Sequence, residues 1–237
     1  MLRLRTDCPW DREQTHATIA PYTIEEAYEV KEAVDRGDME ELRDELGDLL
    51  FQVLFQSQIA SESGHFDLDG VADGLVAKMV RRHPHVFAGA DKPDWDAVKA
   101  QERAGKPQAG TLDGIALALP ALIRAQKLQK RAATVGFDWP DAEGAFDKIV
   151  EEARELRDAP ETERHEEAGD LLFAVVNLVR KLGIDAEAAL RDGNAKFARR
   201  FERAEADAGG FAELSLEEMD AFWEAAKRAE RMKGPDA

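Results

Sequence analysis

Two groups of carboxylates, spaced alike in the two halves of the chain, are the residues best suited to chemistry. Each half carries Glu-x-x-Glu and then, after a polar stretch, Glu-x-Gly-Asp. The members are Glu26, Glu29, Glu45 and Asp48 in the first half, and Glu152, Glu155, Glu167 and Asp170 in the second. Residues three apart lie on adjacent turns of one helix face, so two antiparallel helices would gather four carboxylates in a small volume. Such a group needs water or cations around it, because buried carboxylates without partners are costly to desolvate.

Hard oxygen ligands of this kind suit Mg²⁺, or alternatively Mn²⁺, rather than zinc. A lone Glu-Glu-x-x-Glu in a chain with 34% charged residues is better explained as a solvated helix face, but two ordered copies favour a metal site. Gly47 and Gly169 each cost about 1 kcal/mol relative to Ala inside a helix, which predicts close approach by a neighbouring helix or a ligand. Asp48 and Asp170 precede Leu-Leu-Phe, so we expect both at the edge of the core.

Basic and aromatic residues follow the carboxylates in the same order in both halves. They are Lys78, Arg81, Arg82, Trp95 and Lys99 in the first half, and Lys196, Arg199, Arg200, Trp223 and Lys227 in the second. Guanidinium groups match phosphate oxygens, and an indole ring offers a face for stacking a base. Together these residues predict a nucleotide site. The simpler alternatives are basic helix ends that complement the helix dipole and tryptophans that anchor a core.

Periodicity and end signals predict an all-α fold. Thr23, with Glu26 three residues later, is a candidate N-cap for a helix that ends near Gly37. Leu-spaced apolar residues predict a second helix over Met39–Ser61. The second half repeats this pair over 145–158 and 162–182, preceded by a helix over 119–131. A short break between consecutive helices implies an antiparallel pair.

The shared order of motifs indicates a tandem duplication. We expect one helical unit over residues 1–105, a Gly- and Pro-containing linker over 106–118, and a second unit over 119–237. Each unit is expected to resemble a four-helix bundle that is completed in a dimer.

Charge and cysteine content restrict the class of protein. The formal net charge of −17 disfavours general nucleic-acid binding. Cys8 is the sole cysteine, so no intrachain disulfide can form, and a reducing cytoplasm is the expected location. The apolar stretches are too short to span a bilayer, so no membrane partner is expected.

With these residues in view, the sequence resembles the MazG family of nucleoside triphosphate pyrophosphohydrolases. The resemblance rests on CPWDREQT, PYTIEEAYEV, ELGDLLFQV and RRHPHVF in the first half, and on RAQKLQKRAATVGFDW, EEAGDLLFAVVNL and NAKFARRF in the second. It implies hydrolysis of a nucleoside triphosphate to a monophosphate and pyrophosphate, with several magnesium ions per site, in a homodimer of two-unit chains. It also implies that the second unit is the principal catalytic one.

The resemblance assigns metal binding to the four acids of the second unit, and nucleotide contact to Lys196, Arg200, Trp223 and Lys227. The segment between Glu155 and Glu167 is four residues shorter than that between Glu29 and Glu45, which leaves Glu166 as an alternative ligand to Glu167. In the same segment Arg164 stands where a lysine is expected.

In the expected mechanism, metal-bound carboxylates position a water molecule for attack on the α-phosphorus. Glu152 takes part as a ligand, and Glu151 or Glu25, the first acid of each Glu-Glu pair, is the candidate base. Two alternatives belong to other classes of protein: a nucleotide sensor that does not hydrolyse its ligand, and a helical dimerisation scaffold whose acids are merely solvated.

Overall fold

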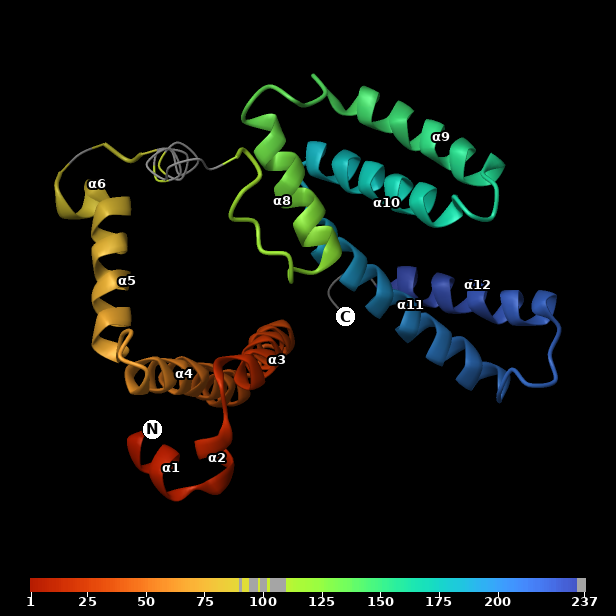
Figure 1. Ribbon diagram of the computed structural model, residues 1–237. Helices are drawn as coiled ribbons and strands as arrows, with labels where there is room; N and C mark the ends of the chain where they lie inside the picture. Colours follow the sequence, from red (N-terminus) through yellow and green to blue (C-terminus); the bar gives the residue numbers. More distant parts are fainter. Residues whose placement is uncertain (90, 94–97, 99–101, 103–109, 234–237) are drawn as a thin grey trace. The chain divides into compact units, whose positions relative to one another are not determined.

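The computed structural model describes residues 1–89, 91–93, 98, 102 and 110–233, and every regular element in these ranges is a helix (Figure 1). The predicted all-α class is therefore confirmed. The chain forms two compact units, Met1–Lys106 and Pro107–Ala237. No helix within the described ranges is both long and apolar enough to cross a membrane. The tandem duplication, the four-helix-bundle likeness and the dimer stay predictions.

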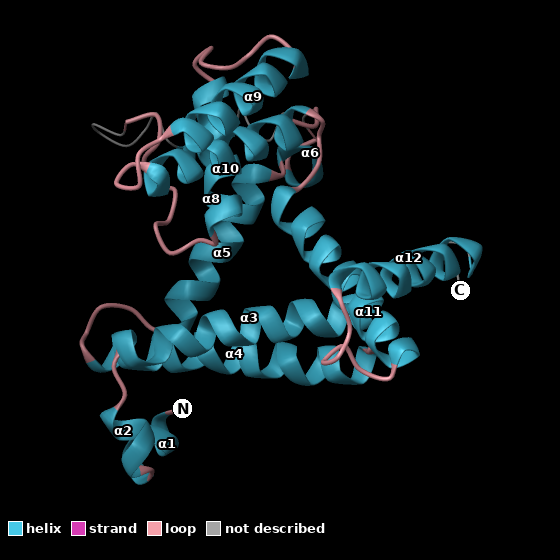
Figure 2. Ribbon diagram, turned by 90° about the vertical axis from the view of Figure 1, so that its right-hand side faces the viewer, coloured by secondary structure: helices cyan, strands magenta, loops and turns pink. Residues whose placement is uncertain are grey.

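The first unit is built on a pair of long antiparallel helices. Its helices are α1 (Leu2–Asp7), α2 (Pro9–Glu13), α3 (His16–Arg36), α4 (Met39–Glu62), α5 (Leu68–Arg82) and α6 (Pro84–Phe87). The chain reverses between α3 and α4 at Gly37, whose φ of 70° is a left-handed conformation that glycine adopts without strain. Asp38 then caps α4 by accepting hydrogen bonds from the backbone N–H groups of Glu40 and Glu41. Figure 2 shows α3 and α4 lying side by side along their length.

The predicted N-cap at Thr23 is wrong, because α3 begins two turns earlier. Thr15 is the N-cap, and it exchanges hydrogen bonds with Thr18 in a capping box. Pro21 lies inside the helix, where its missing N–H removes one intrahelical bond without ending the helix. The early start places Ile19 in the core, where it packs with Phe55 and Ile59 of α4.

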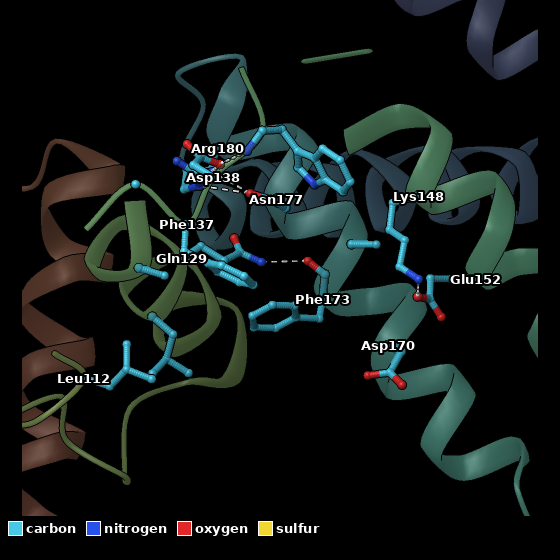
Figure 3. A pocket seen from close by; sticks show the side chains of 15 residues that line it. Leu112, Gln129, Phe137, Asp138, Lys148, Glu152, Asp170, Phe173, Asn177 and Arg180 are labelled. Carbon is cyan, nitrogen blue, oxygen red and sulfur yellow. Dashed lines mark hydrogen bonds and ion pairs between the residues drawn. The ribbon is translucent and has the colours of Figure 1, made fainter. Parts of the chain in front are cut away.

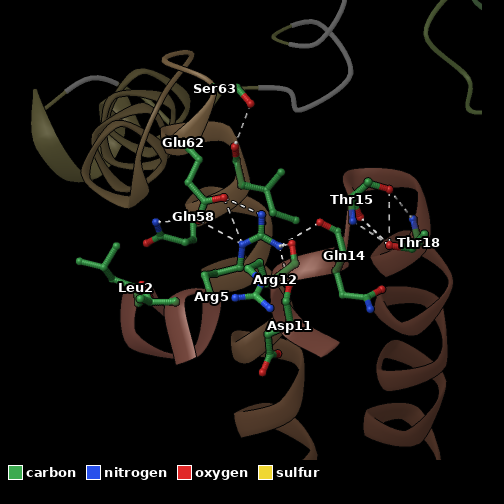
Figure 4. Close-up of polar contacts among 12 residues, drawn as sticks. Leu2, Arg5, Asp11, Arg12, Gln14, Thr15, Thr18, Gln58, Glu62 and Ser63 are labelled. Carbon is green, nitrogen blue, oxygen red and sulfur yellow. Dashed lines mark hydrogen bonds and ion pairs between the residues drawn. The ribbon is translucent and has the colours of Figure 1, made fainter. Parts of the chain in front are cut away.

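Arg5 fastens the two short N-terminal helices to the end of α4 (Figure 4). Its guanidinium donates to the main-chain carbonyls of Asp11 and Gln14, and it forms an ion pair with Glu62. The Arg5 side chain is largely buried. The ion pair lowers the pKa of Glu62 below its ordinary range, so both charges persist at neutral pH.

The second unit contains α8 (Ala121–Ala133), α9 (Ala142–Asp158), α10 (Arg164–Lys181), α11 (Ala186–Ala208) and α12 (Leu216–Lys233). The helix α9 pairs with α10, α11 pairs with α12, and α8 packs on both α10 and α11. Gln126 joins α8 to the start of α11, since its amide donates to the carbonyl of Ile184 and accepts from the N–H of Ala186. The bounds of α4, α8, α9 and α10 differ from the predicted ones by at most three residues.

Candidate active site

The second carboxylate group comes together between α9 and α10. One carboxylate oxygen each of Glu152, Glu167 and Asp170 lies within 4.8 Å of the others. Glu152 is the buried member, with 5% of its surface exposed. Glu155 lies close enough to couple with Glu152 and Glu167, although it is outside the 4.8 Å group. Partial desolvation, followed by the neighbouring carboxylates, raises the pKa of Glu155 and of Glu167. The four predicted ligands thus repel one another and favour a cation among them.

Lys148 supplies a positive charge at this group. Its ammonium lies 2.8 Å from Glu151 Oε1 and 2.6 Å from Glu152 Oε1. These two contacts raise the pKa of Lys148, so it stays charged under all ordinary conditions. Lys148 therefore partly neutralises the carboxylates and holds the buried carboxylate of Glu152 in place.

The first carboxylate group forms in the same way between α3 and α4. Oxygen atoms of Glu26, Glu29 and Glu45 lie within 4.8 Å of one another, and Asp48 is close enough to raise the pKa of Glu26 and of Glu45. Desolvation is the larger cause in both. Gln52 donates a 3.3 Å hydrogen bond to Glu26. The acids within 4.8 Å are not equivalent in the two units, since Glu29 takes part in the first and Asp170 in the second. The two groups also differ in their neighbouring charge, because Tyr22 stands four residues before Glu26, where Lys148 stands four residues before Glu152.

Two expectations about these groups need correction. A Cβ atom added at Gly47 or at Gly169 would meet nothing within 4 Å among the described residues, so neither glycine marks close approach by a helix of the same unit, and approach by a ligand stays a prediction. Asp48 and Asp170 are exposed rather than placed at the core edge. The second leucine after each aspartate is also more than half exposed. The Leu-Leu-Phe runs misled the prediction because consecutive residues of a helix point to different sides, and not every side of α4 or α10 is covered by a neighbouring helix.

A cavity of about 670 Å³ extends from the second carboxylate group (Figure 3). Lys148, Glu152 and Asp170 lie at one end of it, and Gln129, Phe137 and Asn177 lie toward the other. Its walls come from α8, α9 and α10 and from the turn around Phe137 and Trp139. That turn is fixed to the end of α10, because Asp138 forms ion pairs with Arg180 and Lys181. The volume is ample for a nucleotide.

The cationic residues predicted for the second unit, Lys196, Arg199, Arg200 and Lys227, do not line this cavity. Arg199 and Arg200 contact Glu230. Lys227 contacts Glu224, and the Trp223 ring lies 5.2 Å from that of Phe197. Lys196 is exposed on α11.

In the first unit, Arg81 and Arg82 both bind Glu102, which lowers the pKa of that carboxyl to about 2. Lys78 is half-buried on α5. The predictions for Trp95 and Lys99 fall outside the described residues.

Comparison with known proteins identifies the family. A family model of the MazG nucleotide pyrophosphohydrolase domain matches residues 14–87. The chain is 48% identical to the nucleoside triphosphate pyrophosphohydrolase of Escherichia coli K12, with 97% of this chain and 95% of that protein covered. This chain belongs to the MazG family. It is also 45% identical to the nucleoside triphosphate pyrophosphohydrolase/pyrophosphatase MazG of Thermotoga maritima, over 95% of this chain and 91% of the relative. A third relative, YabN of Bacillus subtilis, is 43% identical, and the match covers 97% of this chain but half of that protein.

Membership of the MazG family confirms the resemblance drawn from the motifs. The sequence did not reveal Lys148, because one lysine among many charged residues carries no signal until its distance from Glu152 is known. The Gly-Phe-Asp-Trp segment at 136–139 belongs to the motifs of the resemblance, but the sequence alone does not indicate its structural role. The structure shows that Phe137, Asp138 and Trp139 all line the cavity.

Proposed function

We propose that this chain hydrolyses nucleoside triphosphates between the α- and β-phosphorus atoms, releasing a nucleoside monophosphate and pyrophosphate. The second unit is the proposed catalytic centre. The observation that carries the proposal is the group of Glu152, Glu167 and Asp170, with Lys148 beside it, at one end of a nucleotide-sized cavity. The names of the full-length relatives support the same reaction.

The residues present fit Mg²⁺. The donors are carboxylate oxygens, as a hard cation prefers, and they lie within 4.8 Å of one another, with that of Glu152 buried. Glu152, Glu167 and Asp170 would hold the ion, with Glu155 as the fourth predicted ligand and Glu166 as the alternative to Glu167. When bound, magnesium supplies positive charge that stabilises phosphoryl oxygens; Mn²⁺ has the same ligand preference.

The chain's own residues supply the remaining functions. Lys148 places a permanent positive charge where the triphosphate enters, which offsets the repulsion between the substrate and the protein's acids. Glu151, exposed and hydrogen-bonded to Lys148, is placed to accept the proton that the attacking water loses. The apolar walls of the cavity offer the nucleoside a surface on which to pack.

The first unit is a second candidate metal site, with Glu26, Glu29, Glu45 and Asp48 as its ligands and Glu25 beside them. Its lack of a lysine at the position of Tyr22 supports the second unit as the main centre. Lys196, Arg200, Trp223 and Lys227 remain the nucleotide contacts implied by the family. Exposed apolar side chains on the helix pairs, Leu50 and Leu172 among them, support a homodimer in which these faces are covered.

Pyrophosphate release from a panel of ribo- and deoxyribonucleoside triphosphates with Mg²⁺ tests the proposal. We expect Glu152→Gln to abolish release. Asp147→Asn, which removes an exposed carboxylate from the same helix, is expected to leave release unchanged. Glu26→Gln measures the share of the first unit. Absence of release from the wild type on every substrate would refute the proposal, and magnesium-dependent nucleotide binding without release would indicate a sensor.

A further inference from the structure

Two buried glutamines on α8 differ in whether their side-chain amides have all their hydrogen-bond partners within the protein. Gln126 and Gln129 lie three residues apart and are 7% and 6% exposed. Both ends of the Gln126 amide have protein partners, at Ile184 and Ala186. Gln129 donates from Nε2 to the carbonyl of Phe173 at 2.8 Å, but its Oε1 is buried and has no hydrogen-bond partner in the described part of the chain. A buried acceptor left unpaired is destabilising, so Gln129 Oε1 needs a hydrogen-bond donor from outside the described chain, either water or a ligand.

The orientation of the Gln129 amide is fixed. A main-chain carbonyl can only accept a hydrogen bond, so the nitrogen of the amide has to face Phe173 and the oxygen has to face away from it. Gln129 lines the cavity that begins at Glu152 and Asp170. Figure 3 shows its side chain beside Phe137, at a distance from the carboxylate group. Phe137 is 81% exposed, so its ring has room to turn aside when a ligand enters.

A second amide in the cavity presents the opposite polarity. Asn177 Oδ1 accepts from Arg180 Nε at 3.1 Å and from Arg180 Nη2 at 2.6 Å. Because a guanidinium group can only donate, the Asn177 amide is also fixed, with its NH₂ group left as a donor. An acceptor and a donor among apolar and aromatic walls suit the hydrogen-bonding edge of a nucleobase.

We propose that Gln129 Oε1 accepts a hydrogen bond from an N–H group of the substrate's base and thereby selects bases that carry such a group. The inference rests on the proposed function, since it places the triphosphate at Glu152, Asp170 and Lys148 and the base at the Gln129 end of the same cavity. Gln129 is a specificity-determining residue in this arrangement.

The test compares substrates that differ in a single N–H donor. ATP is compared with purine riboside triphosphate, and CTP with 2-pyrimidinone riboside triphosphate, each analogue lacking the exocyclic amino group. For the wild type we expect kcat/KM to fall roughly tenfold to hundredfold in at least one pair, because the analogue leaves the acceptor unpaired. Gln129→Met keeps the size of the side chain and is expected to bring the ratio within each pair close to one.

Gln126→Met is the matched control. It removes a buried amide from the same helix, so it should lower the melting temperature while keeping the wild-type preference within each pair. Equal ratios in wild type and Gln129→Met would overturn the inference while leaving the hydrolase proposal intact. If the wild type releases no pyrophosphate at all, the hydrolase proposal fails, and equilibrium binding of the same pairs decides the role of Gln129. The wild-type comparison needs no variant, so it holds even if Gln129→Met does not fold.

Discussion

Replacing Glu152 by Gln separates the effect of metal binding from that of carboxylate repulsion. In the absence of metal, the charge of Glu152 is repelled by Glu167 and Asp170, both within 4.8 Å, and attracted by Lys148 at 2.6 Å. At the dielectric constant of water, each repulsion is at least about 0.9 kcal/mol and the attraction is about 1.6 kcal/mol. Lower effective dielectric constants scale all three by the same factor. The repulsions therefore offset the attraction, and the metal-free variant should melt no more than about 2 °C below the wild type.

Magnesium should raise the melting temperature of the wild type more than that of Glu152→Gln. A ligand present at 100 times its dissociation constant stabilises the folded state by about 2.7 kcal/mol. For a chain of this length that corresponds to a rise in Tm of about 5–11 °C. We expect the wild type to show this rise and Glu152→Gln to show little of it, because the buried ligand charge is lost.

Differential scanning calorimetry with EDTA and with a series of Mg²⁺ concentrations measures both terms. Asp147→Asn, on the same helix but outside the group, should behave as the wild type in both conditions. An undiminished magnesium-induced rise in Glu152→Gln would refute the ligand assignment. A large loss of stability of that variant in EDTA would show that the balance of charges has been misjudged.

Three further predictions concern the elements that position the cavity and the first unit. Although burial by itself raises the pKa of Asp138, Arg180 and Lys181 together lower it, so the ion pairs stabilise the folded state at neutral pH and cease to do so as the pH falls through this lowered pKa. Asp138→Asn should therefore cost about 2 kcal/mol at pH 7 in urea unfolding, and the difference from wild type should close as the pH falls through the lowered pKa of Asp138. A difference independent of pH would contradict the ion-pair role. Gly144→Ala would place a Cβ atom 2.8 Å from the Trp139 ring, so the indole has to move. We expect KM to rise severalfold, with an unchanged magnesium-induced shift in Tm. An unaltered KM would show that the Trp139 ring does not contact the substrate. Arg5→Met should lower the stability of the first unit by about 3 kcal/mol in urea unfolding, since it removes the cation that pairs with Glu62 and the donor to the carbonyls of Arg12 and Gln14. A change below about 0.5 kcal/mol would show that solvent replaces these bonds.

The helices that carry the carboxylates were predictable from the sequence because local signals and periodicity agree there. Gly37 and Asp38 separate α3 from α4, and α4 begins at the predicted Met39. The start of α3 was not predictable from Thr23, because the capping pair at Thr15 and Thr18 competes with it and Pro21 is tolerated inside the helix. Such competition is settled by packing, here by the burial of Ile19.

The residue types of the candidate site can be predicted from the sequence, but the hydrogen-bond donors and acceptors that it leaves free cannot. Spacing alone indicates that Glu152, Glu167 and Asp170 share one side of a helix pair. The free oxygen of Gln129 is invisible in the sequence, since Gln126 has the same neighbours in type and a similar burial. Only the position of the Phe173 carbonyl distinguishes an amide with a free acceptor from one with none.

The hydrogen bond from Gln129 to the main chain at Phe173 also bears on how the protein tolerates mutation. Every residue type provides the same carbonyl oxygen, so substitutions at position 173 leave the acceptor of this bond in place. Arg5 is similar, since three of its partners are main-chain oxygens, and so is Lys181, which donates to the carbonyl of Trp139. The orientations of these polar side chains are thus set by the backbone. The neighbouring side chains can therefore be substituted without changing these acceptors. We expect related chains to differ in sequence on the cavity wall while each polar group keeps its direction.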